Sequence, residues 1–209
     1  MIDPIDWLQG QGVSRETLDR LVLLERLTIE ANEQQNLISR STIEHFWTRH
    51  ILDSAQLVPM AAEPRPGAWI DLGAGAGFPG LVVALLIERP VVLIEMRRLR
   101  VEHLERMIAA LNLGDRVRVI KSRVESVRLE SPAAVISARA YAPLDRLIPS
   151  ALHLADRHTL WLLPKGKSAV SELEAARGSW HGSFTIEPSL SDPDGGIIKA
   201  SGLVPRRRA

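Results

Sequence analysis

A glycine-rich stretch carries the clearest chemical signal in this 209-residue sequence. Its glycines recur at alternate positions, which lets a backbone turn tightly and approach a ligand without a Cβ in the way. An acid stands on either side: Asp71 comes just before the glycines, and Glu95 follows Gly75 by twenty residues. The pattern predicts a loop that cradles a small ligand. The stretch reads Asp71-Leu72-Gly73-Ala74-Gly75-Ala76-Gly77-Phe78-Pro79-Gly80.

Two ligand classes compete for this loop. Residues 75–80 match G-x-G-x-x-G, and Glu95 has the spacing of the acid that binds ribose hydroxyls in dinucleotide sites. In such a site a pyrophosphate rests on the helix N-terminus. The carboxylate of Asp71 would repel a pyrophosphate but would suit a cationic or ammonium-bearing ligand. The residues therefore favour a cationic ligand over a dinucleotide.

The elements that must position the loop alternate along the chain. Short apolar runs predict strands, and helical spacing predicts a helix after most of them, which is typical of a parallel, doubly wound α/β sheet. A last pair of strands, joined by a turn too short for a crossover helix, is expected to be antiparallel. The loop then lies at the carboxyl end of the first strand, where open α/β sheets bind ligands. The expected strands are 69–72, 91–95, 117–120, 133–137, 159–163, 183–187 and 197–200, and the expected helices are 80–87, 99–111, 144–154 and 168–177.

The first 66 residues predict helices without strands. Ser14 is a plausible N-cap for a helix that runs to Asn36. The capping-box pattern at 41–44 predicts a second helix through about Leu57, ended by the prolines at 59, 64 and 66. We therefore expect residues 1–66 to form a helical extension, 67–204 the ligand-binding core, and 205–209 a frayed basic tail.

The second of these helices carries a polar face. Arg49 and Asp53 stand four residues apart, which predicts an ion pair between them. His45 and His50 lie on adjacent turns, but a metal site needs convergent ligands and a further partner. We therefore expect no metal.

The pattern D-L-G-x-G-x-G, with an acid at the end of the second strand, resembles the S-adenosylmethionine site of class I methyltransferases. That cofactor carries a sulfonium, an ammonium and a ribose diol, and Glu95 would accept both ribose hydroxyls. The resemblance implies a Rossmann-like, doubly wound, mostly parallel seven-stranded sheet with an N-terminal helical extension.

The resemblance becomes more specific with Gly77-Phe78-Pro79-Gly80. This segment, followed by an acid and a basic pair, resembles the bacterial small-subunit ribosomal RNA guanine-N(7) methyltransferases, the RsmG or GidB family. The similarity covers residues 7 to 200 approximately. This chain departs from the family pattern at Ala74, at Arg97-Arg98 and at Ser126. The further matching pieces are Asn36-Leu37, His50-x-x-Asp53-Ser54, Arg123-Val124-Glu125, Ser137-Ala138-Arg139-Ala140 and Lys165-Gly166.

The resemblance also implies roles for individual residues. Gly73 and Phe78 would line the cofactor pocket, Val124 and Glu125 would lie beside the adenine, and Arg139 would lie near the methionine end or the target base. The full set implied to bind the cofactor is Asp71, Gly73, Gly75, Gly77, Phe78, Glu95, Val124, Glu125 and Arg139. Cations near the carboxyl ends of strands predict contacts with RNA phosphates, and these are Arg97, Arg98, Arg123 and Lys165.

The implied reaction moves a methyl group from S-adenosylmethionine to N-7 of a guanine in 16S ribosomal RNA, in the decoding-region hairpin of the small subunit. Guanine N-7 has an in-plane lone pair and no proton to remove. Catalysis should therefore come mainly from orientation, and we assign no catalytic acid or base. Arg139 or Lys165 is the candidate to hold O-6 of the guanine or a nearby phosphate.

Composition and charge agree with such a protein. Hydrophobic residues make up 45% and charged residues 24%, and the chain has no Cys, which excludes disulfides and thiolate metal sites. No apolar run reaches the about 18 residues of a membrane span, and the N-terminus begins no signal peptide, so we expect a cytoplasmic monomer. Residues 1–66 carry six basic and ten acidic residues, whereas 67–209 carry twenty and fifteen. The basic excess of the core is mostly Arg, which suits phosphate, although genome composition also explains that preference.

Two other functions stay open from the sequence. One is a small-molecule methyltransferase or a nicotinamide-dependent oxidoreductase, which binding of NAD(H) without binding of S-adenosylmethionine would reveal. The other is a noncatalytic RNA-binding or assembly factor that has kept the fold. The retained Asp71, Gly73 and Glu95 count against the second.

Overall fold

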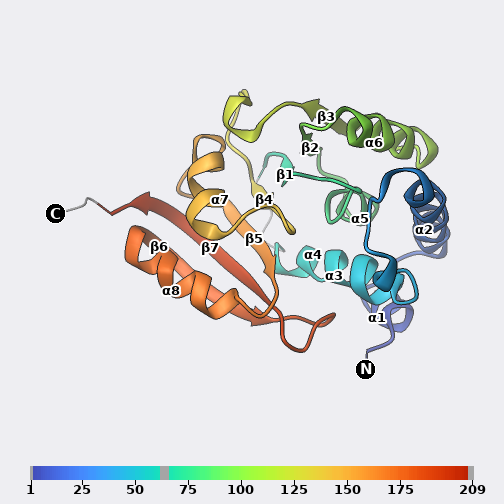
Figure 1. Cartoon of the computed structure of the whole chain (residues 1–209), viewed down its shortest axis with the longest axis horizontal. Coiled ribbons are helices and arrows are strands. Elements are labelled where there is room, and N and C mark those ends of the chain that lie inside the picture. Colours follow the sequence, from blue (N-terminus) through green and yellow to red (C-terminus); the bar gives the residue numbers. More distant parts are fainter. Residues whose placement is uncertain (1, 62–65, 207–209) are drawn as a thin grey trace.

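The computed structural model describes residues 2–61 and 66–206, and a seven-stranded sheet forms its centre (Figure 1). The strand order is β3-β2-β1-β4-β5-β7-β6. All neighbours are parallel except β5 with β7 and β6 with β7, so the expected mostly parallel sheet with an antiparallel closing pair is confirmed. The strands are β1 Trp69–Leu72, β2 Val91–Glu95, β3 Val117–Lys121, β4 Val135–Ser137, β5 Leu160–Lys165, β6 Trp180–Pro188 and β7 Gly196–Pro205.

The chain reverses its direction of travel across the sheet at β1. It runs outward from β1 to β2 and β3, then returns to the other side of β1 to form β4 and β5. Because β1, β2 and β4 are parallel, their carboxyl ends meet at one edge. Connections that leave in opposite directions open a crevice at that edge, which is where ligands bind in such sheets.

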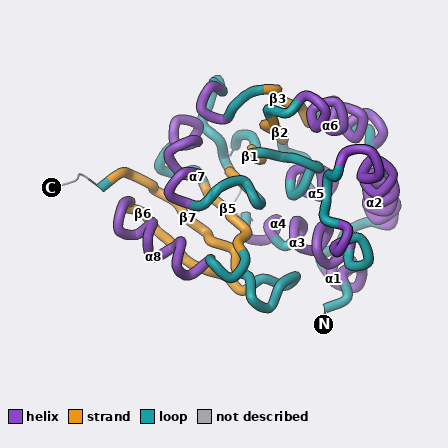
Figure 2. Tube along the Cα trace, viewed as in Figure 1, coloured by secondary structure: helices purple, strands orange, loops and turns teal. Residues whose placement is uncertain are grey.

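Helices cover both faces of the sheet (Figure 2). Alternation along each strand divides the core into two clusters: Trp69 packs on one face, with the N-terminal helices, α5 and α6, and Ile70 packs on the other, with α7 and α8. The helices that follow the N-terminal segment are α5 Gly80–Leu86, α6 Arg98–Ala110, η3 Val124–Ser126, α7 Leu144–Ala151, η4 Leu152–Leu154 and α8 Ala169–Ser179. Among the described residues, no helix is both long and apolar enough to cross a bilayer.

The N-terminal segment differs from the expectation in several places. Ser14 caps the first long helix by accepting from Thr17 N, and Asn36 ends it in the left-handed conformation, both as predicted. The sequence pattern missed a short helix before it, which Asp3 caps. The predicted single helix from Ser41 is wrong, because the chain forms a series of short 3-10, π and α turns instead. The elements are α1 Pro4–Gly10, α2 Arg15–Gln35, η1 Arg40–Thr42, η2 Trp47–Leu52, α3 Asp53–Ala55 and α4 Leu57–Met60.

Three further predictions from the sequence are wrong, and they concern Pro59, the Arg49–Asp53 pair and the start of the C-terminal tail. Pro59 lies inside α4 and does not end the segment, whereas Pro64 lies outside the described residues. The expected Arg49–Asp53 pair is not formed, because Asp192 and Arg139 take these two side chains. The tail does not fray at its start: β7 runs to Pro205, and Arg206 N donates to Ser179 O at 2.9 Å. Residues 207–209 lie outside the described residues.

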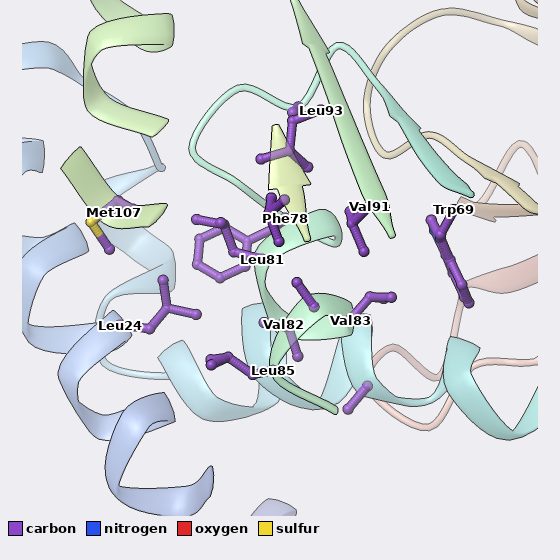
Figure 3. Packing of buried hydrophobic residues seen from close by; sticks show 14 of the residues in the cluster. Leu24, Trp69, Phe78, Leu81, Val82, Val83, Leu85, Val91, Leu93 and Met107 are labelled. Atoms are coloured by element: carbon purple, nitrogen blue, oxygen red, sulfur yellow. The ribbon is translucent and has the colours of Figure 1, made fainter. Parts of the chain in front are cut away.

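The N-terminal helices share one apolar core with the sheet and its helices. Figure 3 shows Leu24 of α2 beside Leu81 and Leu85 of α5 and Met107 of α6. Phe78, from the loop before α5, is buried in the same cluster. The helical extension therefore folds together with the strand–loop–helix unit that it covers.

Candidate active site

Asp71 holds the loop between β1 and α5 from its buried side. Its carboxyl group is fully buried: Oδ2 accepts from Gly80 N at 2.9 Å and Oδ1 accepts from Ser137 Oγ at 2.9 Å. Burial raises the pKa of this carboxyl to about 7, although the two hydrogen bonds act in the opposite direction. A Cβ on Gly80 would clash with Leu93, so the helix can approach the strand this closely only with glycine there.

The loop passes close to a side chain from the segment that follows β4, the strand beside β1. Gly73 has φ +63°, and a Cβ at this position would lie 2.6 Å from Cδ2 of Tyr141. The N–H of Gly75 donates to Oε2 of Glu95 at 3.0 Å. Gly77 is buried, and its N–H donates to Ala74 O at 2.7 Å. The two acids singled out from the sequence thus shape the loop itself.

Glu95 ends β2 and is 5% exposed. Its Oε1 accepts from the N–H groups of Met96 and Arg97 at 2.8 and 2.9 Å, and its Oε2 accepts from Gly75. A carboxylate oxygen has two lone-pair sites, so Oε2 keeps one for a further donor. This is the acceptor that a ribose hydroxyl requires.

A cavity of about 280 Å³ opens beside this carboxylate, and we call it the Glu95 hollow. It brings together four of the residues implied to bind the cofactor, Gly73, Glu95, Val124 and Glu125. A carboxylate, a close backbone and the apolar side chains of Ile94 and Val124 fit a nucleoside. The lining is Gly73, Ile94, Glu95, Met96, Arg97, Arg100, Ser122, Arg123, Val124, Glu125, Ala140 and Tyr141.

Phe78 and Arg139 lie apart from this cavity. Phe78 is buried, and its ring contacts Phe46 and His50, with centroids 5.6 and 5.0 Å away. The guanidinium carbon of Arg139 lies 5.3 Å from the centroid of the Phe78 ring, a cation–π contact. Phe78 thus supports the neighbouring cavity through Arg139 and does not itself line the Glu95 hollow.

That neighbouring cavity measures about 660 Å³, and we call it the Arg139 hollow. It shares Ala140 and Tyr141 with the Glu95 hollow, so this short segment after β4 forms a wall common to both cavities. Ala140 holds a positive φ of +51°, which is uncommon for a residue with a side chain. The lining includes the N-terminal segment, the end of β5 and the β6–β7 turn, which are distant in sequence.

Three ion pairs line the Arg139 hollow. Arg49 Nη1 lies 3.0 Å from Asp192 Oδ2, Arg139 Nη1 lies 3.3 Å from Asp53 Oδ2, and Lys165 Nζ lies 2.8 Å from Glu172 Oε2. Two of the pairs, Arg49–Asp192 and Arg139–Asp53, join elements that are far apart in the sequence, and Lys165–Glu172 joins β5 to the following helix α8. The hollow is therefore polar, with donors and acceptors in balance.

His50 stabilises this arrangement as a neutral ring. Its Nδ1 lies 3.1 Å from Nη2 of Arg139, and its Nε2 lies 2.9 Å from Oγ1 of Thr42. Burial, together with the charges of Arg139 and Arg49, lowers the pKa of His50 to about 3. A neutral Nδ1 can accept from the guanidinium. Within residues 2–61 and 66–206, no group of three or more metal-ligating side chains converges.

The four cations predicted to contact RNA occupy three different settings. Arg97 and Arg123 line the Glu95 hollow and are exposed. Arg98 pairs with Glu102 on the outer face of α6. Lys165 lies at the wall of the Arg139 hollow, where Nζ also donates to Ala142 O at 2.7 Å. The structure thus brings Arg97 and Arg123 together and leaves the other two apart.

Two residues of the site were missed from the sequence. Tyr141, the only tyrosine of the chain, lines both hollows. It follows the matching Ser137–Ala140 segment directly, and that position was the available signal. Arg100 also lines the Glu95 hollow, and a Cβ on Gly75 would lie 3.4 Å from its Nη1.

Comparison with known proteins decides the family. The family described as "GidB: rRNA small subunit methyltransferase G" matches residues 17–190. The chain belongs to this family. The GidB-family relative from Rhizorhabdus wittichii, named "Ribosomal RNA small subunit methyltransferase G", is 51% identical over 201 residues, which cover 96% of this chain and 92% of the relative. The relative of the same name from Zymomonas mobilis is 43% identical over 210 residues, covering 97% and 94%.

Solved structures confirm the fold expected for a GidB-family protein. A methyltransferase from Geobacter sulfurreducens aligns with a TM-score of 0.59 at 15% identity, covering 96% of this chain and 97% of that one. A putative S-adenosyl-L-methionine-dependent methyltransferase from Methanococcus maripaludis aligns with a TM-score of 0.58 at 14% identity, covering 85% and 91%. With the family match, these findings make the chain an S-adenosylmethionine-dependent ribosomal RNA methyltransferase of the class I fold.

Proposed function

We propose that this methyltransferase binds S-adenosylmethionine in the Glu95 hollow and admits a guanine of 16S ribosomal RNA into the Arg139 hollow, where N-7 receives the methyl group. The observation that carries this proposal is the segment shared by the two hollows, Ala140 and Tyr141. A methyl donor on one side of this segment and an acceptor base on the other can meet at its edge.

The residues of the Glu95 hollow fit the cofactor. The free lone pair on Oε2 of Glu95 suits the ribose diol, and Gly73, whose lack of a Cβ leaves room for Tyr141, contributes backbone to the lining. Val124 and Glu125 are the residues we assign to the adenine. When bound, the cofactor supplies an electrophilic methyl group on its sulfonium.

In this proposal Asp71 and Phe78 do not contact the cofactor or the base, and they act by positioning other residues. Asp71 positions the loop through Gly80, and Phe78 positions Arg139 through ring contact. Gly75 and Gly77 complete the loop through their backbone hydrogen bonds. We assign Arg139 to O-6 of the guanine, because its Nη2 and Nε keep N–H groups beyond those bound to Arg49 O, Asp53 and His50.

The chemistry requires orientation more than proton transfer. Guanine N-7 presents a lone pair and loses no proton, so the chain needs only to hold the base in line with the methyl group. The exposed guanidinium groups of Arg97 and Arg123 are placed to hold phosphates of the same RNA. Because one chain supplies both hollows, we propose that the protein acts as a monomer. Because the proposed substrate is ribosomal RNA of the small subunit, we propose that it acts in the cytoplasm.

The function is tested in cells by mass spectrometry of 16S ribosomal RNA. We expect a deletion strain to lack one N(7)-methylguanosine, and expression of this chain to restore it. Persistence of the modified nucleoside in the deletion strain would refute the proposed function.

The cofactor site is tested with Glu95→Gln. We expect the dissociation constant for S-adenosylmethionine to rise about tenfold to a hundredfold, because hydrogen bonds to a charged acceptor contribute about 1.5–3 kcal/mol each. Isothermal titration calorimetry measures the affinity, and urea unfolding of the same preparations shows whether the variant is folded. Glu105→Gln makes the same chemical change on the exposed face of α6 and should bind the cofactor like the wild type. An unchanged affinity in a folded Glu95→Gln would place the cofactor elsewhere.

A further inference from the structure

The Arg139 hollow contains three carboxylates as well as three cations, although its proposed occupant belongs to a polyanion. Carboxylates repel phosphates but accept hydrogen bonds from a base that carries donors. Guanine carries such donors on its Watson–Crick edge, at N-1 and at the 2-amino group. At least one of the three carboxylates is therefore a candidate to read the base.

Glu172 is already occupied by other donors. Its Oε1 accepts from Ser168 Oγ at 2.7 Å, and its Oε2 accepts from Leu144 N at 3.0 Å and from Lys165 Nζ. These bonds cap α7 and hold the loop before it. Glu172 therefore serves the scaffold of the hollow.

Asp192 lies at the outer side of the hollow. It pairs with Arg49 across the β6–β7 turn, and both side chains are more exposed to solvent than those of Asp53 and Arg139. The carboxylate of Asp192 binds Arg49 and the N–H of Asp194, and Arg49 accepts from Arg139 only through its backbone O, whereas Asp53 binds Arg139 through its side chain. This pair borders the entrance, away from the segment where the methyl group is transferred.

Asp53 is better placed. Its partner Arg139 directly precedes Ala140, the residue shared by the two hollows. Oδ1 of Asp53 accepts from Ser191 Oγ and from Gln56 Nε2, which fixes the carboxylate in place. Among the residues that the structure describes, Oδ2 accepts only from Arg139 Nη1, which leaves it one lone-pair site. A fixed acceptor with one free site faces the hollow beside a fixed donor.

The order of these groups matches the order of atoms around guanine. N-7, O-6 and N-1 follow one another along one side of the base. With N-7 at the edge of Ala140, a donor must come next for O-6 and an acceptor after it for the N-1 proton. Arg139, which is next to Ala140 in the chain, supplies the donor, and Asp53, which pairs with Arg139, supplies the acceptor. Adenine, which has an amino group at position 6 and no N-1 proton, would leave the free N–H of Arg139 and the free lone pair of Asp53 Oδ2 without partners.

Resting on the proposed function, we propose that Asp53 is a specificity-determining residue, whose Oδ2 accepts the N-1 proton of the target guanine while Arg139 donates to O-6. The N-terminal segment then reads the base as well as covering the core. The enzyme thus distinguishes guanine from adenine through a donor, Arg139, and an acceptor, Asp53, which are fixed by their own ion pair.

The test uses 16S RNA, assembled into small subunits, that carries either guanine or 2-aminopurine at the methylated position. 2-Aminopurine keeps N-7 and the amino group but lacks O-6 and the N-1 proton. The readout is the ratio of single-turnover methylation rates on the two substrates, from which the fraction of folded enzyme cancels. We expect Asp53→Asn to lower the preference of the wild type for guanine about tenfold, because one hydrogen bond to a charged acceptor is lost.

Two matched variants make the result decisive. Asp192→Asn makes the same change in the adjacent ion pair and should keep the guanine preference within about threefold of the wild-type value. His50→Ala removes another partner of Arg139 but leaves Asp53 intact, so it measures how much a disturbed Arg139 alone lowers the preference, and we expect a smaller decrease than for Asp53→Asn. If Asp53→Asn keeps the preference, or if His50→Ala lowers it equally, Asp53 does not read the base. If the wild type methylates neither substrate at N-7, the proposed function fails instead.

Discussion

Asp71 was selected from the sequence as a candidate ligand contact, but in the structure it stabilises the loop. The sequence placed a carboxylate two residues before the first glycine of the loop, and a direct contact with a cationic ligand was expected. In the structure this carboxylate is fully buried and bound to Gly80 N and Ser137 Oγ. The spacing could predict that an acid meets the loop. It could not predict which side of the loop the acid occupies, because that depends on how closely α5 approaches β1.

The burial of Asp71 predicts a pH dependence of stability. Its pKa is raised from 3.8 to about 7 in the folded chain, so the folded state keeps a proton that the unfolded state releases between these values. The contribution of the protonated form to stability is therefore present below pH 4 and is lost as the pH rises to about 7. Asp71→Asn does not titrate, so its free energy of unfolding should fall less than that of the wild type between pH 4.5 and 7.5. Urea unfolding at both pH values measures the difference, and parallel changes in the two proteins would contradict the prediction.

The strands were predictable as elements because continuous apolar runs admit few other structures in a chain of this kind. The boundaries shifted by a few residues, as at β4, which is shorter than expected, and β7, which is longer. The N-terminal segment was harder, since a π-helix and several short turns between Arg40 and Met60 have no single period. That segment supplies His50 and Asp53 to the site, so the part of the site least visible in the sequence comes from its least regular elements.

The loop from Ala138 to Pro143 depends on Lys165 and Glu172, which hold it at Ala142 O and Leu144 N. We expect Lys165→Met to lower the free energy of unfolding by about 2 kcal/mol, because a hydrogen-bonded cation is removed and Glu172 loses its partner. We also expect methyl transfer to slow, while the salt dependence of RNA affinity stays as in the wild type. Urea unfolding, single-turnover rates and RNA titrations at several KCl concentrations test this. A flatter salt dependence would show that Lys165 instead contacts a phosphate.

At the scale of the whole molecule, the structure shows where the acidic and the basic parts of the sequence lie. The net charge of residues 1–66 is negative, and these residues cover one face of the sheet, whereas Arg97, Arg100 and Arg123 of the basic part surround the Glu95 hollow. No ion pair joins these three arginines to an acid within residues 2–61 and 66–206. Genome composition also explained the excess of arginine in the sequence, and only the fold could show that these cations gather at one edge.

These cations predict a salt-dependent affinity for RNA. Each phosphate contact with single-stranded RNA contributes about 0.7 to the slope of log affinity against log salt. We expect the double variant Arg97→Gln/Arg123→Gln to reduce that slope by about 1 to 2. Titrations of 16S RNA at several KCl concentrations measure it. Arg26→Gln, an exposed arginine on α2 outside both hollows, is the matched control and should keep the wild-type slope. Equal slopes for all three proteins would exclude Arg97 and Arg123 from the RNA contact.

If the proposed assignment of the two hollows holds, the wall that they share links the binding of the cofactor to the binding of the RNA. Ala140 and Tyr141 face both, and Ala140 is held at an uncommon backbone angle. A ligand that shifts this segment on one side changes the free energy of binding on the other, and the two effects must be equal in magnitude. The factor by which RNA changes the affinity for the cofactor is therefore the factor by which the cofactor changes the affinity for RNA. Loss of the methyl group alters the cofactor beside this segment, so the same linkage connects the chemical step to the release of the modified RNA.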